Sequence, residues 1–258
     1  MQKVIVITSG KGGVGKTTTA INLGAAINHF GGDVLIIDGN MSTPNIGIHL
    51  NSPDVPVDLN QVLLGEAEAV EAVYQHYSGI KIVPSSLSIT ELKKIRPERL
   101  KDFKKDFKKI SNYILVDSSA GLGKEATTVM EMADELIIVT NPEIAAITDA
   151  LKTIKIAERM KKPVMGVIVT RVKKDQIEMQ PETVREMLEV PILGMIPEHI
   201  AVRKSLNMRD AVVHTHPKSP PSRAYKEIAA RIVNVKYDSE ADKEKILERV
   251  MRVFGLRS

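Results

Sequence analysis

Short runs of consecutive apolar residues recur along the chain, and segments with helical periodicity separate most of them. The apolar runs cover residues 3–8, 34–38, 80–84, 113–117, 136–140, 164–170 and 192–196. The helical patterns cover residues 17–30, 97–110, 145–160, 181–188 and 219–233. Strands that are apolar throughout and alternate with helices are typical of a sheet buried on both faces. The pattern predicts an α/β fold with a mostly parallel central sheet of seven or eight strands, covered by helices on both faces.

The same pattern divides the chain into three parts. Residues 1–233 read as one α/β domain, since 258 residues with 43% hydrophobic content can form one sizeable core. Residues 234–242 are polar and lack periodicity, so we expect a linker there. Residues 243–258 regain helical periodicity, and we expect a separate C-terminal helix.

A glycine-rich segment follows the first apolar run and precedes the first helical pattern. It reads Gly10, Lys11, Gly12, Gly13, Val14, Gly15, Lys16, Thr17, Thr18. This order fits the phosphate-binding pattern G-x-x-x-x-G-K-[ST] at a strand-to-helix turn. Glycines let consecutive backbone N–H groups point at one phosphate chain, and the helix N-terminus adds its dipole. We expect Lys16 to reach the β- and γ-phosphates of a nucleotide, and the Thr17 hydroxyl to complete the coordination of Mg²⁺.

Two apolar runs end in an aspartate, Asp38 and Asp117. Ligands of parallel sheets bind at the carboxyl ends of the strands, so both aspartates are expected on the edge that carries the glycine-rich segment. A carboxylate at position 117 would orient Mg²⁺ or its bound waters. The chain therefore carries the parts of a magnesium–nucleotide site.

Composition and charge limit the partners, the localisation and the chemistry that we expect. The formal net charge of +4 and the pI of about 9.1 are mildly basic, which suits nucleic acid, an anionic membrane or plain solubility. The sequence has no run of eighteen apolar residues and no signal peptide, so we expect a cytosolic protein. It also contains no cysteine, which excludes disulfides, thiolate metal sites and cysteine nucleophiles.

The lysine that follows the first glycine gives the loop the form K-G-G-x-G-K-T-[ST], which resembles the deviant Walker A loop of the MinD/ParA class of ATPases. The resemblance implies ATP as the nucleotide, and a homodimer in which Lys11 reaches the nucleotide of the other subunit. It also argues against the nitrogenase iron protein and the iron–sulfur carrier ATPases of the Mrp type, because those relatives need cysteines.

By the same resemblance, Asp38 begins the D-x-D segment of the family and belongs to the metal shell with Thr17 and Asp117. The second aspartate of that segment helps to orient the attacking water, and Asn40 stands in its place here. An amide can hydrogen-bond to water but cannot accept its proton, so hydrolysis is in question while ATP binding is not. Asn40 is either natural or an engineered substitution. The expected catalytic residues are Lys11, Lys16 and Asn40.

Further positions match by resemblance. Glu143 would contact the ribose across a dimer, and the base would lie among Thr170, Arg171, Pro197 and Glu198. The family usually has Asn where this chain has Thr170. The face toward a second subunit or a partner would include Lys11, Asn45, Gly121, Glu143 and Asp149, with the Gly121 N–H near the γ-phosphate. Asp149 reads equally well as a surface charge.

The last sixteen residues form an amphipathic pattern. One arc of about 160° at 100° per residue carries Ile246, Leu247, Val250, Met251, Val253 and Phe254. From residue 243 onward the chain has five basic and two acidic residues, a net charge of +3. Such a helix can pack on its own domain or lie in a membrane interface. The layout resembles that of MinD, which favours membrane binding.

These observations together predict a MinD-like ATPase. It would bind Mg-ATP, form an ATP-sandwich homodimer and attach to an anionic membrane on its cytoplasmic face, to position a cell-division or other complex with an activating partner protein. A flagellar-placement regulator of the MinD type, a ParA-like DNA-partitioning ATPase and a nucleotide-binding scaffold without turnover remain as alternatives. Specific DNA binding is not expected, because DNA offers no use for an aliphatic arc at residues 246–254.

Overall fold

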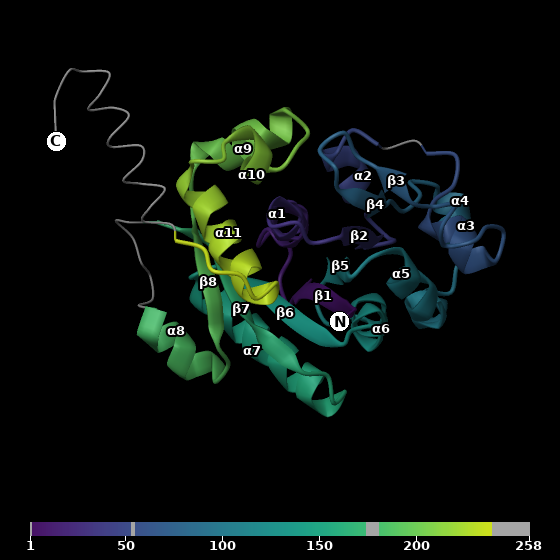
Figure 1. Cartoon of the computed structure of the whole chain (residues 1–258). Coiled ribbons are helices and arrows are strands. Elements are labelled where there is room, and N and C mark those ends of the chain that lie inside the picture. The colour runs from purple at the N-terminus through teal and green to yellow at the C-terminus, as the bar shows by residue number, and fades with distance from the viewer. Residues whose placement is uncertain (1, 53–54, 174–180, 239–258) are drawn as a thin grey trace, which may run out of the picture.

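The molecule is built around a central sheet with helices packed around it (Figure 1). The computed structural model describes residues 2–52, 55–173 and 181–238. Within them, eight strands lie in the order β3-β4-β2-β5-β1-β6-β7-β8. The strands are β1 (Lys3–Ser9), β2 (Val34–Gly39), β3 (Tyr74–Gln75), β4 (Lys81–Val83), β5 (Tyr113–Ala120), β6 (Glu135–Thr140), β7 (Val164–Val172) and β8 (Ile192–Pro197). All neighbouring pairs are parallel except β3 with β4, so the predicted mostly parallel sheet is confirmed.

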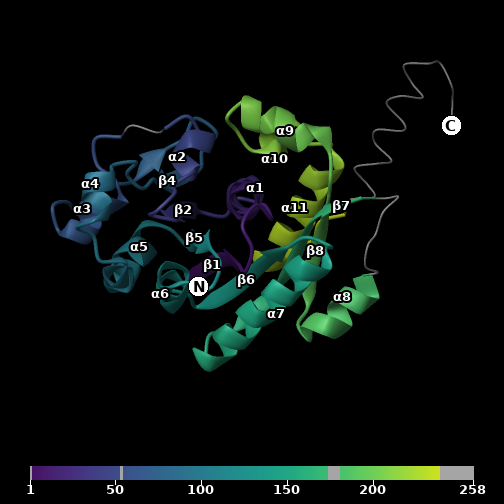
Figure 2. The ribbon, with the colours of Figure 1, turned by 180° about the vertical axis from the view of Figure 1, so that it is seen from behind.

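Helices cover both faces of the sheet (Figures 1 and 2). They are α1 (Lys16–His29), α2 (Ile46–His49), α3 (Leu59–Leu64), α4 (Ile89–Leu92), the 3₁₀-helix η1 (Pro97–Phe103), α5 (Lys104–Ile110), α6 (Lys124–Glu131), α7 (Ile144–Arg159), α8 (Pro181–Leu188), α9 (Ile200–Asn207), α10 (Val212–Thr215) and α11 (Pro220–Ile232). No helix in residues 2–52, 55–173 or 181–238 is long and apolar enough to cross a membrane.

Alternate side chains of the central strands enter different cores. Ile5 and Ile7 of β1 pack in one core with α1 and α11, whereas Val4 and Val6 pack in a second core with α3, α5 and α6. A third core lies between β6, β7 and the helices α7 and α8. Strands buried on both faces explain why the sequence shows continuous apolar runs rather than alternation.

The helix predicted over residues 97–110 is two helices in the structure. Its first half is the 3₁₀-helix η1, and only residues 104–110 are α-helical. The apolar residues explain the change. Pro97, Leu100 and Phe103 are spaced by three, which suits three residues per turn, whereas Phe103 and Phe107 are spaced by four. Leu100 and Phe107 are fully buried, so each half presents its own face to the core.

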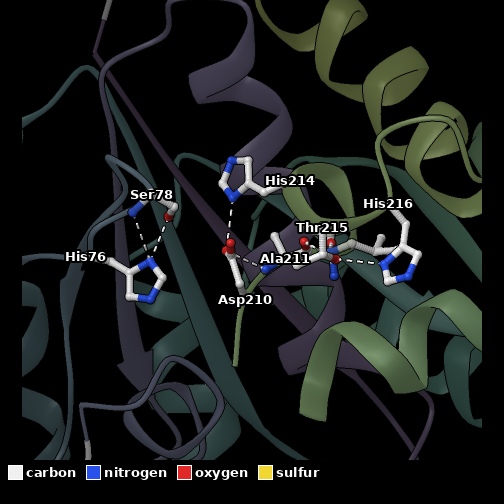
Figure 3. A network of polar contacts seen from close by, with 9 residues as sticks. His76, Ser78, Asp210, Ala211, His214, Thr215 and His216 are labelled. Atoms are coloured by element: carbon white, nitrogen blue, oxygen red, sulfur yellow. Dashed lines mark hydrogen bonds and ion pairs between the residues drawn. The ribbon is translucent and has the colours of Figure 1, made fainter. Parts of the chain in front are cut away.

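A network of polar contacts holds α10 and the segments next to it (Figure 3). The Asp210 carboxylate pairs with the His214 ring at 2.9 Å and accepts the Ala211 N–H at 2.7 Å. The Val212 N–H donates to the side chain of Asn22, whose amide donates in turn to the Thr18 carbonyl. The Val212–Asn22 bond ties α10 to α1.

The predicted linker begins inside the described chain. The Tyr237 ring meets the Phe30 ring edge-on, with 5.4 Å between the ring centroids. Residues 239–242, and the predicted C-terminal helix at residues 243–258, lie outside the described residues.

Candidate functional site

The glycine-rich segment joins β1 to α1, where a strand-to-helix turn was expected. Gly15 caps the helix with a φ of 92°, a left-handed conformation that a side chain would strain. Lys16 then begins α1 and is largely buried. Two hydroxyl groups brace the loop from behind, because Ser9 Oγ donates to the Lys11 carbonyl at 2.8 Å and Thr170 Oγ1 donates to the Val14 carbonyl at 2.6 Å.

Two carboxylates lie beside this loop. Asp38 and Asp117 are direct neighbours on the adjacent parallel strands β2 and β5, and both are fully buried. Burial and the charge of Asp117 raise the pKa of Asp38 to about 8, against three backbone N–H bonds that lower it. Burial likewise raises the pKa of Asp117 to about 6, although Thr17 and Lys16 oppose the rise. A cation at this position would relieve the repulsion.

One oxygen of this pair lacks a partner. Thr17 Oγ1 donates to Asp117 Oδ2 at 2.6 Å, while Asp117 Oδ1 is buried without a hydrogen-bond partner in the described chain. Carboxylate and hydroxyl oxygens are the ligands that Mg²⁺ prefers, usually together with phosphate oxygens and waters. Thr17, Asp38 and Asp117 therefore fit a magnesium site. Burial lowers the pKa of Lys16, and Asp117 opposes this shift, so Lys16 is a poorly solvated cation beside the expected phosphates.

The segment after β2 folds back on Asp38. The Asp38 carboxylate accepts the N–H groups of Asn40 at 3.2 Å, Asn45 at 2.8 Å and Ile46 at 2.9 Å. These bonds place Asn45 at the start of α2 and fix residues 39–46 around the carboxylate. We refer to residues 39–46 as the Asp38 loop.

Asn40 makes two bonds to one residue of this loop. Its Nδ2 donates to the Thr43 carbonyl at 2.6 Å, and its Oδ1 accepts from Thr43 Oγ1 at 3.1 Å. An aspartate could accept the second bond but could not donate the first. Asn40 is therefore engaged within the loop, and its amide has a structural use that the sequence did not reveal. Asn45 Nδ2 also donates to the Thr43 carbonyl, at 2.6 Å.

The residues expected at a dimer face lie near one another on the same edge. Lys11 Nζ pairs with Glu143 Oε2 of the same chain at 2.7 Å, and this bond lowers the pKa of Glu143. A Cβ on Gly10 would clash with the Asp149 carbonyl oxygen, so α7 packs tightly against the loop. The Gly121 N–H donates to the Ser9 carbonyl at 2.9 Å and is thus already engaged, rather than free for a phosphate.

A pocket of about 580 Å³ opens beside the loop. Val14, Gly15 and Thr18 line one side, and the predicted base-side residues Thr170, Arg171, Pro197 and Glu198 line another. The Thr170 hydroxyl is committed to the Val14 and Thr140 carbonyls, so it braces the pocket wall. The pocket also includes residues that the sequence did not single out, among them His199, Arg203 and Tyr225. Tyr225 OH lies 3.2 Å from Thr19 Oγ1, deep in the core.

The sequence did not indicate Ser42, Thr43 or Glu125 either. Ser42 bonds to Glu125 of α6, whereas Thr43 bonds to Asn40 and Asn45 within the loop, and no local pattern encodes either arrangement. The apolar residues of the tail, Ile246 to Phe254, lie outside the described residues.

Comparisons with known proteins show which family and which proteins the chain resembles. A model of the ParA family, described as "NUBPL iron-transfer P-loop NTPase", matches residues 1–233. An uncharacterized ATP-binding protein of Methanocaldococcus jannaschii is 36% identical over 260 residues, which span 100% of this chain and 98% of that protein.

Two solved structures of cell-division proteins are also similar. The septum site-determining protein MinD of Pyrococcus horikoshii, complexed with Mg-ADP, matches with a TM-score of 0.86 and 32% identity, over 90% of this chain and 96% of that one. A chain of the MinC:MinD complex of Aquifex aeolicus matches with a TM-score of 0.82 and 32% identity, over 92% and 98% of the two chains.

Proposed function

The chain belongs to the ParA family of P-loop NTPases, and from this premise we propose that it is a MinD-like ATPase that binds Mg-ATP and hydrolyses it slowly. One observation carries the proposal. Asp117 sits fully buried beside Asp38 and Lys16, with one oxygen unpartnered in the described chain. Two buried carboxylates side by side are costly without a cation, and a magnesium–nucleotide complex supplies one.

The roles of the residues follow from their positions. Backbone N–H groups at residues 10–18 would hold the phosphates, and Lys16 would neutralise the β- and γ-phosphates. Thr17, Asp38 and Asp117 would hold Mg²⁺ directly or through water. The pocket lined by Thr170, Arg171, Pro197 and Glu198 would take the base. Mg²⁺, when bound, would draw charge from the transferring phosphoryl group.

The slow rate is proposed from Asn40. Its amide is bonded twice to Thr43, and it has no carboxylate with which to accept a proton from the attacking water. Hydrolysis would then rest on phosphate positioning and charge neutralisation rather than on a general base. The same observation favours one alternative, a nucleotide-binding scaffold without turnover.

Dimerisation upon ATP binding is part of the proposal. Lys11 and Glu143, which the family resemblance assigns to the opposite subunit's nucleotide, are partly exposed and pair with each other in the single chain. A solvent-exposed ion pair is weak, so exchanging it for contacts with a second nucleotide is feasible. Gly121 and Asp149, on the same edge, would lie at the same interface.

Membrane attachment is proposed from the sequence of residues 243–258 alone. A single amphipathic helix binds an anionic bilayer weakly, whereas two helices on one dimer gain avidity. The ATP-bound dimer would thus occupy the cytoplasmic face of the membrane and position another complex. The Aquifex MinD forms a complex with MinC, and we propose a protein partner of comparable kind here. Flagellar placement and DNA partitioning remain alternative roles.

Iron transfer is not part of the proposal, although the description of the family model mentions it. Protein-bound iron–sulfur clusters are held mainly by cysteine thiolates, and these 258 residues include no cysteine.

Three measurements test the proposed function. Titration calorimetry with ATP and ADP, with and without Mg²⁺, should give magnesium-dependent binding. Phosphate release should be slow but measurable, and no release from a chain that binds Mg-ATP would favour the scaffold. Co-sedimentation with anionic vesicles should increase with ATP, and the tail variant I246E/F254E should abolish it. If vesicles never bind the full chain, the membrane role is wrong.

A further inference from the structure

A single carboxylate of α6 holds the outer part of the Asp38 loop. Ser42 donates its N–H to Glu125 Oε1 at 3.1 Å, and Ser42 Oγ donates to the other oxygen, Glu125 Oε2. Two bonds from one carboxylate to one residue fix both the position and the orientation of that residue. The other side-chain hydrogen bonds of residues 40–43 in the described chain stay between residues 38 and 45.

Glu125 lies close in sequence to residues beside the expected phosphate site. It is in the first turn of α6, four residues after the turn at Gly121, whose N–H is bonded to the Ser9 carbonyl at the end of β1. Asp117 lies four residues before Gly121, in strand β5, which leads into this turn. Glu125 therefore connects the end of β5 to the loop that surrounds Asp38.

The start of α6 is held on its other side as well. Lys124 Nζ pairs with Glu98 Oε1 of η1 at 2.6 Å. A cavity of about 620 Å³ lies beside this pair, with Glu125, Thr128 and Arg96 in its lining. The two bonds to Ser42 are solvent-exposed and the cavity is open, so losing the Glu125 carboxylate would release Ser42 without forcing a collapse of the helix.

We propose that Glu125 is a positioning residue for ATP hydrolysis, which acts by holding Ser42 and thereby fixing the Asp38 loop, with Asn40 in it, relative to the end of β5. The inference rests on the proposed function and adds to it a residue that touches neither nucleotide nor metal. Its effect belongs to kcat, because the P-loop and the base pocket, which set nucleotide affinity, do not include Glu125.

The test uses the full chain, four single variants and one double variant. Glu125→Ala removes both bonds and keeps a good helix former, and Glu125→Gln keeps an oxygen that can accept the Ser42 N–H. Glu131→Gln is the matched control, since Glu131 lies in the same helix and its ion pair with Lys101 at 2.9 Å is remote from Ser42. Ser42→Ala removes the hydroxyl bond and leaves the backbone bond.

Steady-state ATP hydrolysis should show a split between the two kinetic constants. We expect Glu125→Ala to lower kcat about tenfold with KM within about twofold, because a misplaced catalytic group slows chemistry more than it weakens binding. Glu125→Gln should fall between Glu125→Ala and the parent chain, and Glu131→Gln should match the parent. Ser42→Ala added to Glu125→Ala should cause no further loss, since the two changes remove one contact.

Amide hydrogen exchange of the nucleotide-free chain gives a second measure that needs no turnover. Exchange at Ser42 should be about tenfold faster in Glu125→Ala and unchanged in Glu131→Gln. Unchanged exchange, an unchanged kcat, or a rise in KM alone would each overturn the positioning role. A parent chain that binds Mg-ATP without turnover would overturn the proposed hydrolysis, and this role with it. The exchange data would still report whether the contact forms, so the two failures can be told apart.

Discussion

Acidic residues at the two ends of the central sheet differ in burial, in pairing and in pKa. At the carboxyl ends of the strands, Asp38 and Asp117 are fully buried side by side, and their pKa values are raised. At the amino ends, the acidic residues are partly exposed and paired with lysines. Asp33 pairs with Lys81, Glu135 with Lys3, and Asp134 with both Lys104 and Lys108, all at 2.7–2.8 Å.

The acidic residues at the amino ends contribute to stability, whereas those at the carboxyl ends are suited to binding. The Asp134 carboxylate also accepts the N–H of the buried Val4 at 2.9 Å, and these bonds outweigh partial burial and lower the pKa of Asp134 to about 2. Charge at the amino ends therefore stabilises the fold. Charge at the carboxyl ends destabilises the fold unless a cation joins it, which is the pattern expected of a binding site.

Removing a charge from the carboxyl end should have the largest effect. Asp117→Asn should weaken Mg²⁺-dependent ATP binding about a hundredfold, since a lost metal ligand is worth about 3 kcal/mol. The same change should raise the melting temperature of the nucleotide-free protein, because it removes the repulsion with Asp38. Calorimetry and thermal unfolding measure the two effects. Asp134→Asn is the control, and its nucleotide affinity should be unchanged. An Asp117→Asn variant that binds normally and melts earlier would refute the comparison.

Removing the charge at the amino end should have the converse effect. Asp134→Ala should lower the free energy of unfolding by about 1–2 kcal/mol, because it leaves the buried Val4 N–H unpaired. ATP affinity should not change. Urea denaturation provides the measurement, and Asp106→Ala, which removes only a surface pair with Lys109, is the control with no expected change. Equal losses in both variants would mean that Asp134 has no special role.

Asp134 should also make a smaller contribution to the pH dependence of stability in acid. The folded state lowers the pKa of Asp134 from its usual 3.8 to about 2, so the stabilisation is complete above pH 3.8 and is lost as the pH falls through about 2. Asp134→Ala should remove this part of the acid dependence. Denaturation midpoints between pH 2 and pH 5 would show it. Parallel pH profiles for the two proteins would contradict the assignment.

The smallest effect is expected for the ion pair at the exposed rim of the carboxyl end. Glu143→Gln should leave the melting temperature of the single chain unchanged, because solvent screens the pair with Lys11. If it nevertheless changes ATP-dependent association in sedimentation, the residue acts at an interface, as proposed. A clear drop in melting temperature would show that the pair is structural.

The parts of this site that are local in sequence could be predicted. The segment at residues 10–18 carries its own pattern, and Asp38 and Asp117 end apolar runs, so parallel strands necessarily bring them to the same edge. The fold followed from the same runs. Strand β3 was missed because its two residues are too few to show a period, and α2, α4 and α10, with four residues each, were missed for the same reason. Helices α3, α6 and α9, with six to eight residues, were not singled out either.

Contacts that depend on loop packing could not be predicted. Lys11 and Glu143 are 132 positions apart, and Ser42 and Glu125 are 83 apart. Asn40 was recognised as a departure from its family, but its bonds to Thr43 depend on the turn that the Asp38 loop makes. Such bonds leave no periodic trace, because polar residues in loops are common for many reasons.

The short strand β3 has a consequence for how copies of the chain can meet. An open sheet edge invites strands from other molecules and leads to aggregation, and proteins often guard against this with very short edge strands. Here Tyr74 and Gln75 cover β4 in antiparallel register, and the Tyr74 hydroxyl is tied to the backbone of Val57. A strand of two residues offers few free backbone groups to another molecule, so strand addition at this edge is disfavoured.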